Sequence, residues 1–231
     1  MSSLKCLSIL IPAYNEEENI KRVIRQALED AKRLTNDFEI VIVDDGSSDN
    51  TGKIADLIAK KDKYVRIIHH KTNQGLGQAL QTGVKECKND FIIYIEGDGQ
   101  SLLKDQGKLF EKINESEIVL GYRHSRKDYT LFRKILSYGY LLLLRILFNL
   151  TFRDVNWSAA FQRKIFDSIE VKSSTPFFLA ETVIKSLRYG FRVCEAPTLY
   201  HPRIAGHTSL GNVRTAYHMF IEMIKFRFGL D

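Results

Sequence analysis

The turn Glu96-Gly97-Asp98-Gly99-Gln100 contains acidic residues at a spacing that is suited to binding a metal ion. It follows an apolar run and places two carboxylates two residues apart, with glycines that allow a close backbone approach. Such a pair can face one hard cation, and Mg²⁺ or Mn²⁺ held by one or two carboxylates usually also binds substrate phosphates. A metal-free acidic turn gives the same pattern, because Asp-Gly is a common turn dipeptide.

A second acidic turn, Asp44-Asp45-Gly46-Ser47, also follows an apolar run. A carboxylate at this position could accept a hydrogen bond from a nucleobase or from a ribose hydroxyl. The same residue types close many strands without any ligand. The turn by itself leaves both interpretations open.

The segment 73–83 is rich in glycine, and its backbone N–H groups could cradle a phosphate at the start of a helix. Its spacing is not that of the dinucleotide fingerprint, because after Gly75 and Gly77 the next glycine is Gly83. The segment also lacks the Lys-Ser or Lys-Thr ending of a P-loop. Both of these nucleotide-binding motifs are therefore excluded.

The elements that would position these turns are short apolar runs separated by helical periodicity. Strands are predicted at Leu7–Ile11, Phe38–Val43, Val65–His69, Phe91–Ile95 and Glu117–Leu120. After the first strand, the acidic residues Glu16, Glu17 and Glu18 are predicted to form the first turn of a helix. Alternating strands and helices favour a parallel sheet covered on both faces, with ligands beyond the carboxyl ends of the strands. The two acidic turns fall at such ends.

The second half of the chain has a different character. Residues Gly121–Lys134 are basic, and Ile135–Phe152 is strongly apolar but is interrupted by Arg145. A membrane span needs roughly 20 nearly uncharged residues, so this segment is not predicted to span. It could be a helix that lies on a membrane or a core helix flanked by solvated charge. Further elements are predicted as a helix at Phe177–Tyr189, a strand at Phe191–Ala196, a polar loop at Tyr200–Asn212 and a helix at Val213–Leu230.

Composition narrows the class of protein. The 231 residues include 44% hydrophobic and 27% charged residues, which excludes a disordered tail, a fibrous repeat and a disulfide-rich module. The net charge of +6 suits anionic partners, namely nucleotides, phosphates, acidic lipid or nucleic acid. Three widely separated cysteines favour a reducing compartment, and the N-terminus has no signal-peptide pattern. We expect a soluble or peripheral intracellular protein.

In this order, the turns resemble the motifs of the family 2 glycosyltransferases. The resemblance covers Leu7 to Gln100 and is carried by Ile11-Pro12-Ala13-Tyr14-Asn15-Glu16, by Val43–Ser47 with Asp49 and Thr51, by Asn73, Gly75, Ala79 and Gly83, and by Glu96–Gln100. The second half resembles the polyprenyl-phosphate branch, which contains dolichol-phosphate mannose synthases. Its motifs are Gly121-Tyr122-Arg123, Arg133 with Ser137, Arg153-Asp154-Val155-Asn156, Glu195-Ala196-Pro197, and His201-Pro202-Arg203 with Gly206.

The resemblance implies an α/β protein with the GT-A fold, a Rossmann-like three-layer arrangement of a mainly parallel sheet between helices. One domain would cover residues 1–231, with a nucleotide-sugar half (1–100), an acceptor half (101–212) and a C-terminal amphipathic helix (213–231). The implied reaction is an inverting transfer from a GDP- or UDP-sugar to a polyprenyl or dolichyl phosphate at the cytoplasmic face of a membrane. The implied partners include the membrane surface and an integral membrane subunit or a second copy of the chain, but no nucleic acid.

The resemblance also implies residue roles. The donor-binding residues would be Pro12, Tyr14, Glu16, Asp44, Asp45, Glu96, Gln100 and Arg203. Asp98, assisted by Glu96, would bind Mg²⁺ or Mn²⁺, and Arg123, Arg133 and Ser137 would bind the acceptor phosphate. Asp98, Arg123 and Arg133 form the expected catalytic set. A phosphate monoester, with a second pKa of about 6, is already nucleophilic at neutral pH, so no base is assigned to Glu181. That glutamate could orient a substrate, or it could be a solvated or capping residue.

The sequence departs from the family pattern at several positions. Glu96 stands where Asp is usual, Ser209 stands near a common Lys position, and Trp157 begins an unusual stretch before Phe161. Many relatives have C-terminal membrane spans, and none is expected in this chain. The alternatives are a family 2 enzyme that acts on a cell-surface polysaccharide or another acceptor, and a non-catalytic homologue. A sugar nucleotidyltransferase would need a glycine-rich loop with Arg where this chain has Pro12–Glu16.

Overall fold

The structure is a computed structural model that describes residues 6–123, 129–203, 205 and 213–230. The strands are β1 (Leu7–Ala13), β2 (Phe38–Asp44), β3 (Val65–His69), β4 (Phe91–Tyr94), β5 (Ile118–Arg123), β6 (Ala159–Gln162) and β7 (Val193–Thr198). The helices are α1 (Ile20–Leu34), α2 (Thr51–Ala59), α3 (Leu76–Glu86), α4 (Gly107–Lys112), α5 (Leu131–Phe148), α6 (Lys164–Ser168), α7 (Phe177–Arg188) and α8 (Val213–Phe228), with a 3₁₀ turn at Leu103–Gln106.

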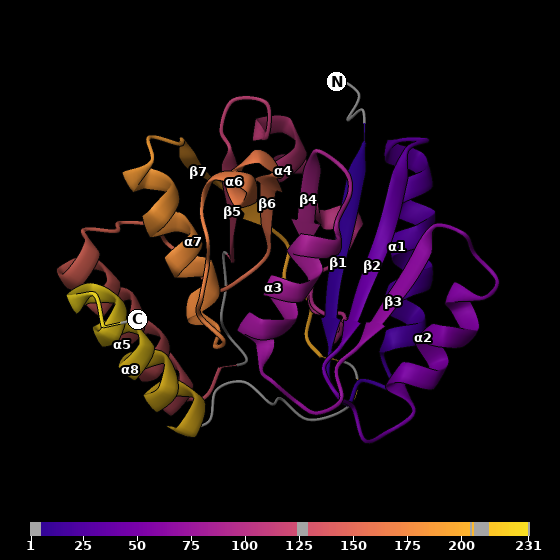
Figure 1. Cartoon of the computed structure of the whole chain (residues 1–231), viewed down its shortest axis with the longest axis horizontal. Helices are drawn as coiled ribbons and strands as arrows, with labels where there is room; N and C mark the ends of the chain where they lie inside the picture. The colour runs from indigo at the N-terminus through magenta and orange to yellow at the C-terminus, as the bar shows by residue number, and fades with distance from the viewer. Residues whose placement is uncertain (1–5, 124–128, 204, 206–212, 231) are drawn as a thin grey trace.

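The strands form one seven-stranded sheet in the order β3-β2-β1-β4-β6-β5-β7. Neighbouring strands are parallel except around β6, which is antiparallel to both β4 and β5. Because β1 to β4 are parallel, their carboxyl ends meet at one edge, the lower edge in Figure 1. The prediction of a mainly parallel sheet is confirmed, whereas β6 was not predicted.

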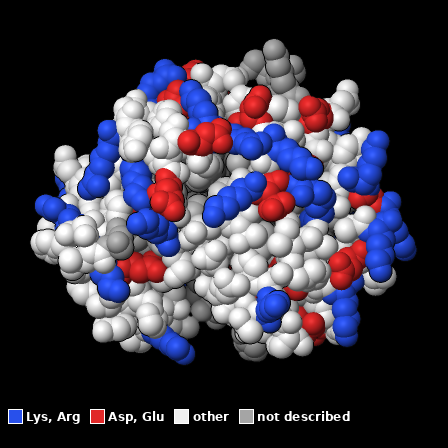
Figure 2. Space-filling view, viewed as in Figure 1, with Lys and Arg blue, Asp and Glu red and all other residues white. Residues whose placement is uncertain are grey.

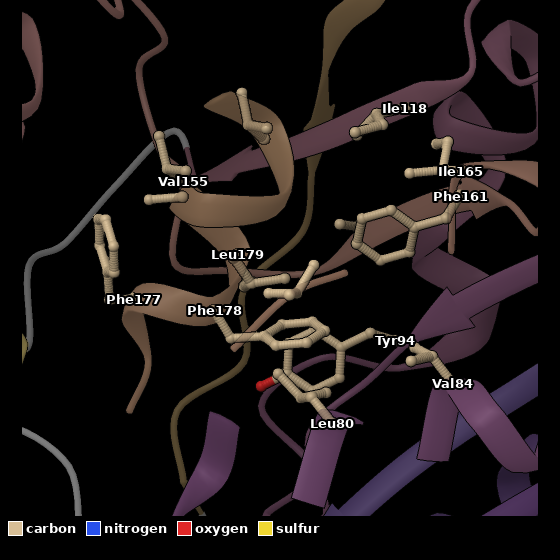
Figure 3. Close-up of a cluster of buried hydrophobic side chains, with 14 of the residues drawn as sticks. Leu80, Val84, Tyr94, Ile118, Val155, Phe161, Ile165, Phe177, Phe178 and Leu179 are labelled. Atoms are coloured by element: carbon tan, nitrogen blue, oxygen red, sulfur yellow. The ribbon is translucent and has the colours of Figure 1, made fainter. Parts of the chain in front are cut away.

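Successive residues of the central strands pack against helices on opposite faces of the sheet, as the twofold side-chain period of a strand requires. Leu10 and Tyr94 belong to a cluster with α3, α5, α7 and α8, whereas Ile9 and Ile11 pack with α1 and the segment around α4. Figure 3 shows the first cluster, where Leu80 of α3, Tyr94 of β4 and Phe178 of α7 converge. The predicted three-layer arrangement is therefore present.

Helices α5 and α8 contact each other and lie side by side at the end of the molecule remote from β3 (Figure 1). Helix α5 begins four residues before the predicted Ile135 and ends at Phe148, and the next residue, Asn149, has a left-handed backbone. Only Leu144 of α5 and Met223 and Phe226 of α8 are buried. The two helices instead expose an apolar stripe: Leu131, Phe132, Ile135, Tyr138, Leu142 and Ile146 of α5, with Val213, Tyr217, Phe220 and Phe228 of α8.

Among the described residues, no helix combines the length and the apolar character that crossing a membrane requires. On the face shown in Figure 2, Lys and Arg side chains are intermixed with Asp and Glu side chains across the upper half. At the amino edge of β5, for example, Glu117 binds Lys164 and Arg192. The apolar stripe thus differs in character from the mixed charge elsewhere.

Candidate active site

The loops that follow β1 and β2 are joined to each other by hydrogen bonds. The backbone N–H of Asn15 donates to Ser47 Oγ at 3.0 Å, and that of Glu16 donates to Thr51 Oγ1 at 2.7 Å. In return, Asn15 Oδ1 accepts from the Ser48 N–H at 2.9 Å. Asn15 adopts the left-handed conformation (φ 53°), which Asn tolerates better than most residues. These contacts hold the chain in a loop after β1.

The prediction that Glu16, Glu17 and Glu18 form the first turn of a helix was wrong, because α1 begins only at Ile20. Hydrogen bonds from the backbone of this segment to side chains beyond β2 take the place of helical ones. Glu17 N–H, for instance, donates to Asp49 Oδ2 at 3.1 Å. The loop geometry directs the Glu16 carboxylate into the site.

Three charged side chains meet beyond the ends of β1 and β4, and we call this group the acidic centre: Glu16, Asp98 and Arg203. Arg203 Nη2 donates to Glu16 Oε1 at 2.9 Å and to Asp98 Oδ2 at 3.0 Å. Asn19 Nδ2 donates to Glu16 Oε2 at 2.8 Å. Both carboxylates are buried. Burial raises the pKa of Glu16, although Asn19 and Arg203 oppose that shift.

Glu96 lies next to this centre and is destabilised in its charged form. Burial and the charge of Asp98 raise the pKa of Glu96 to about 8, against opposing effects of Arg123 and Arg203. Tyr94 donates its hydroxyl to Glu96 Oε1 at 3.4 Å. A divalent cation would relieve this repulsion, and carboxylate oxygens are the ligands that Mg²⁺ and Mn²⁺ prefer. The donor set therefore fits the metal that the sequence predicts.

The described residues include no group of three or more His, Cys, Asp or Glu side chains arranged to hold a metal ion. A site of two carboxylates is the kind that leaves coordination positions for substrate phosphates and water. Gln100, predicted to bind the donor, donates from its backbone to Asp98 Oδ1 at 2.9 Å and from its side chain to Tyr200 at 2.7 Å. Asp98 is thereby held from two sides, by Gln100 and by Arg203.

Pro12 and Tyr14 flank the same edge. Pro12 is in β1, and its carbonyl oxygen would lie 2.9 Å from a Cβ atom added to Gly97. Only glycine allows the Glu96–Gln100 turn to approach β1 this closely. Tyr14 is half-buried in the loop after β1. The structure thus brings the predicted motifs of β1 and β4 together.

Asp45 organises the glycine-rich segment. Its carboxylate accepts from the N–H groups of Gln74 (2.9 Å) and Gly75 (2.8 Å) and contacts His70 Nδ1 at 2.7 Å. Two of the backbone N–H groups of this segment, those of Gln74 and Gly75, are therefore bound by this side chain. Asp45 is also buried.

Asp44 has a similar environment one residue earlier. It accepts from the Ser47 N–H at 3.0 Å and contacts His69 Nδ1 at 2.9 Å, while His69 Nε2 lies 3.3 Å from Asp56. Burial lowers the pKa of His69, but hydrogen bonds to Asp44 and Asp56 outweigh it and raise the pKa overall. The two histidines were not predicted as site residues. Their place at the end of β3, beside the end of β2, is the signal that could have identified them.

Arg123 and Arg133, predicted to bind the acceptor phosphate, both contact Tyr129. Arg133 stacks on its ring at 3.9 Å from the centroid, and Arg123 donates to its hydroxyl at 2.5 Å. Ser137 follows Arg133 by one turn of α5. His124, Arg126 and Lys127 of the basic segment lie outside the described residues, as do Gly206 and Ser209.

Glu181 is 2% exposed, so the interpretation of a solvated glutamate was wrong. Its carboxylate accepts from the N–H groups of Lys172 (3.1 Å) and Ser173 (2.8 Å) and pairs with Lys185 at 2.6 Å. These contacts hold the loop before α7. The Glu181 carboxylate is therefore bound by groups within the protein.

The mostly parallel sheet between helical layers, with acidic turns at its carboxyl edge, defines the GT-A class of folds. The crystal structure of glucosyl-3-phosphoglycerate synthase from Mycobacterium tuberculosis with Mn²⁺, uridine diphosphate and glucosyl-3-phosphoglycerate has the same fold. The TM-score is 0.74 at 18% sequence identity, over 98% of this chain and 81% of that one. Residues 8–170 match the model of glycosyl transferase family 2, and the chain belongs to this family. The predictions of fold and family are confirmed.

Two relatives align over most of the chain. Glycosyltransferase AglD of Haloferax volcanii is 27% identical over 229 residues, which cover 95% of this chain and 36% of AglD. Dolichol-phosphate mannosyltransferase of Pyrococcus furiosus is 30% identical over 213 residues, which cover 88% of this chain and 59% of the relative. The undecaprenyl-phosphate 4-deoxy-4-formamido-L-arabinose transferase of Proteus mirabilis is 31% identical over 132 residues, which cover 57% of this chain and 40% of the relative. The alignments thus span only part of each relative.

Proposed function

We propose that the protein is a metal-dependent inverting glycosyltransferase that moves a sugar from a GDP- or UDP-sugar to a polyprenyl or dolichyl phosphate. The observation that carries the proposal is the closeness of two oppositely charged groups, the carboxylates around Asp98 and the guanidinium of Arg123. Glu96, next to the acidic centre, lies near enough to Arg123 for that guanidinium to lower its pKa against the effects of burial and Asp98. A cation and a nucleotide sugar on one side would then face an anionic acceptor on the other. Names of relatives that act on undecaprenyl or dolichol phosphate support this acceptor class.

For the donor, Asp98 and Glu96 would hold Mg²⁺ or Mn²⁺. When bound, the ion would supply Lewis-acid stabilisation of the diphosphate leaving group. Arg203, already at this centre, would neutralise further charge on the diphosphate. Pro12, Tyr14, Glu16, Asp44, Asp45 and Gln100 would shape the nucleotide pocket, with residues 1–100 as the donor half. Asp45 would act by fixing the segment that begins α3.

For the acceptor, residues 101–212 would position a phosphate monoester. One phosphate oxygen would attack the anomeric carbon, the bond from that carbon to the diphosphate oxygen would break, and the nucleoside diphosphate would leave with the electron pair. Arg123 and Arg133 would neutralise and orient the phosphate, with Ser137 as a further hydrogen-bond partner. No base is needed, in agreement with the engagement of Glu181 by backbone N–H groups.

The apolar stripe supports a membrane location for this reaction. Arg133, a proposed phosphate ligand, lies in the first turn of α5, where the stripe begins. Exposed apolar side chains beside Arg145, Lys225 and Arg227 suit a helix pair that lies at the surface of anionic lipid. We place this surface at the cytoplasmic face, with a lipid-linked acceptor entering along α5.

The first test is a transfer assay. The protein is incubated with UDP- or GDP-sugars and a short-chain polyprenyl phosphate, with Mn²⁺, with EDTA, or with EDTA followed by excess Mn²⁺. We expect lipid-linked sugar and free nucleoside diphosphate in equal amounts, abolished by EDTA and restored by Mn²⁺. Transfer only to soluble sugars or to polysaccharide would contradict the proposed acceptor. The absence of transfer to any acceptor, together with no metal-dependent nucleotide binding, would favour a non-catalytic homologue.

The second test is sedimentation with anionic and neutral liposomes at low and high salt. Each basic side chain near anionic lipid contributes about 1 kcal/mol, so we expect reversible binding that weakens with salt. No binding to anionic liposomes under any salt condition would contradict the membrane location. Such a result would not contradict the proposed sugar transfer, which the first test addresses.

A further inference from the structure

The guanidinium of Arg123 is enclosed by three side chains, Tyr129, Asp154 and Trp157, which we call the arginine frame. Its Nε donates to Asp154 Oδ2 at 2.8 Å, and Nη1 donates to the Tyr129 hydroxyl at 2.5 Å. Its central carbon lies 4.5 Å from the centroid of the Trp157 ring. The side chain of Arg123 is only 7% exposed, and that of Asp154 only 4%. A long side chain that is usually mobile is therefore held in one orientation.

The frame is itself anchored to the rest of the fold. Trp157 donates its Nε1–H to Thr198 Oγ1 of β7 at 2.9 Å, and its ring packs against that of Tyr200 with 5.5 Å between the ring centroids. Tyr200 in turn accepts the Gln100 side chain at 2.7 Å. A chain of contacts thus runs from Arg123 through Trp157 to the turn that contains Asp98.

Tyr129 also contacts two like charges. Its ring centroid lies 3.9 Å from the Arg133 guanidinium and 5.5 Å from that of Arg123. An aromatic face attracts cations, so one ring stabilises both arginines near each other. Two guanidinium groups that contact the same ring form a geometry that suits a dianion with several oxygens.

We propose that Tyr129, Asp154 and Trp157 are positioning residues that preorient Arg123, and through Tyr129 also Arg133, to bind the phosphate of the acceptor. This inference rests on the proposed function. Phosphate recognition by arginine loses affinity when the side chain must be ordered on binding, and a prebuilt frame removes that loss. The frame would select the phosphate end of the acceptor rather than its hydrocarbon tail, and it would not affect the affinity for the nucleotide sugar.

The test compares Asp154→Asn with Asp167→Asn, an exposed Asp of α6, and Tyr129→Phe with Tyr189→Phe, an exposed Tyr at the end of α7. Steady-state transfer to a short-chain polyprenyl phosphate gives KM for the acceptor, KM for the donor and kcat. We expect Asp154→Asn to raise the acceptor KM about tenfold or more, as loss of a charge-assisted hydrogen bond does. Tyr129→Phe should raise it by a smaller factor, about threefold. The donor KM should stay within error of the control variants. The melting temperature of Asp154→Asn should fall, because a buried ion pair loses one partner, and that of Tyr129→Phe should change less.

Trp157 is the only tryptophan of the chain, so its fluorescence reports on the arginine frame. A merely structural role of the frame would not make this fluorescence respond to the acceptor. Addition of the polyprenyl phosphate without donor should change the fluorescence of the wild type, with a midpoint that shifts to higher concentration in Asp154→Asn. Arg123→Lys, which keeps the charge but not the planar fork, should lose the response.

Unchanged acceptor KM and fluorescence midpoint in both Asp154→Asn and Tyr129→Phe would overturn the frame, even if the wild type transfers sugar efficiently. Equal loss of acceptor and donor affinity would also overturn it, because that result marks a general structural role. If Asp154→Asn does not fold, Tyr129→Phe decides, since it removes a single hydroxyl. A wild type that neither binds nor glycosylates the phosphate, while still using nucleotide sugar, would contradict the proposed function instead.

Discussion

The loops after β1 and β2, which form the proposed donor side, differ from the α5–α8 helix pair in the side chains that they bury and expose. Around Asp44 and Asp45, buried polar side chains have partners at 2.7 to 3.0 Å. On α5 and α8, by contrast, large apolar side chains such as Ile135 (61% exposed) and Phe228 (67% exposed) face outward. Preorganised polar side chains suit a small, rigid ligand, whereas an exposed apolar stripe suits an apolar phase. The contrast fits the proposed division between a nucleotide-sugar donor and a lipid-linked acceptor.

The two regions meet at the loop Ser173–Thr175. Glu222 of α8 accepts hydrogen bonds from all three hydroxyl groups of this loop, among them Ser174 Oγ at 2.9 Å. The loop backbone lies against Gly75 and Gly77 at the start of α3, next to the segment that Asp45 binds. Helix α8 is thus connected to the donor side through a short chain of contacts.

The largest effect is expected for Asp98→Asn, which tests the donor side alone. The substitution keeps the shape but removes the charge that would hold the cation, so transfer should fall at least about a hundredfold. Binding to liposomes and the melting temperature should stay near those of Asp167→Asn. Wild-type transfer by Asp98→Asn would show that the site is placed wrongly.

Gly77→Ala tests the junction between the regions. A Cβ atom there would lie 2.4 Å from the Ser174 carbonyl carbon and from Thr175 O, both backbone atoms that cannot move aside. We expect a loss of about 2 kcal/mol in the free energy of unfolding, measured by urea denaturation. The matched control is Gly139→Ala in α5, where an added Cβ meets no atom within 4 Å. That variant should be as stable as the wild type or more stable, because Ala favours a helix interior. Equal stability of the two variants would contradict the close packing at Gly77.

The double substitution Ile135→Asn and Leu142→Asn tests the apolar stripe alone. Both side chains are more than half exposed, so folding stability should change little. Association with anionic liposomes should weaken about tenfold or more, since each side chain loses a part of the roughly 1.5–3 kcal/mol that full burial of such a residue gives. Leu57→Asn on α2 is the control, because Leu57 is 59% exposed outside the stripe. A similar loss for Leu57→Asn would point to non-specific adsorption.

Glu117→Gln should have the smallest effect, and it lies at the amino edge, away from both regions. Burial raises the pKa of Glu117, but hydrogen bonds from Arg192 and Lys164 outweigh it and lower the pKa to about 2. Because the folded pKa lies below the ordinary value of 4.5 for a glutamate, the stabilisation is complete above pH 4.5 and is lost as pH falls toward 2.

At pH 7 the variant should be less stable by about 1 kcal/mol, a value that allows for solvent screening of the exposed Lys164 and Arg192. Urea denaturation from pH 7 to pH 2.5 should show the difference shrink as pH falls. A difference that does not depend on pH would mean that packing, and not charge, is responsible.

The local sequence was enough to predict strands β1 to β4 and the acidic turns that follow β2 and β4. The buried parallel strands β1 to β4 appear as local apolar runs, because both faces of such a strand are covered. The turns after them are recognisable because Asp, Gly, Asn and Ser have local conformational preferences. Motif order then indicated the family, and it predicted Asp98 and Glu96 as the metal ligands.

The contacts between segments that are distant in the sequence could be identified only from the tertiary structure. Strand β6 is four residues long and contains Ala159 and Ala160, so no local pattern marked it, and its antiparallel place between β4 and β5 depends on its neighbours. The contact of Arg203 with Glu16 joins positions 187 residues apart. Periodicity indicates that a helix has an apolar face but not whether another element covers it. For this reason the outward direction of the apolar stripe, the burial of Glu181 and the enclosure of Arg123 became visible only when the chain was folded.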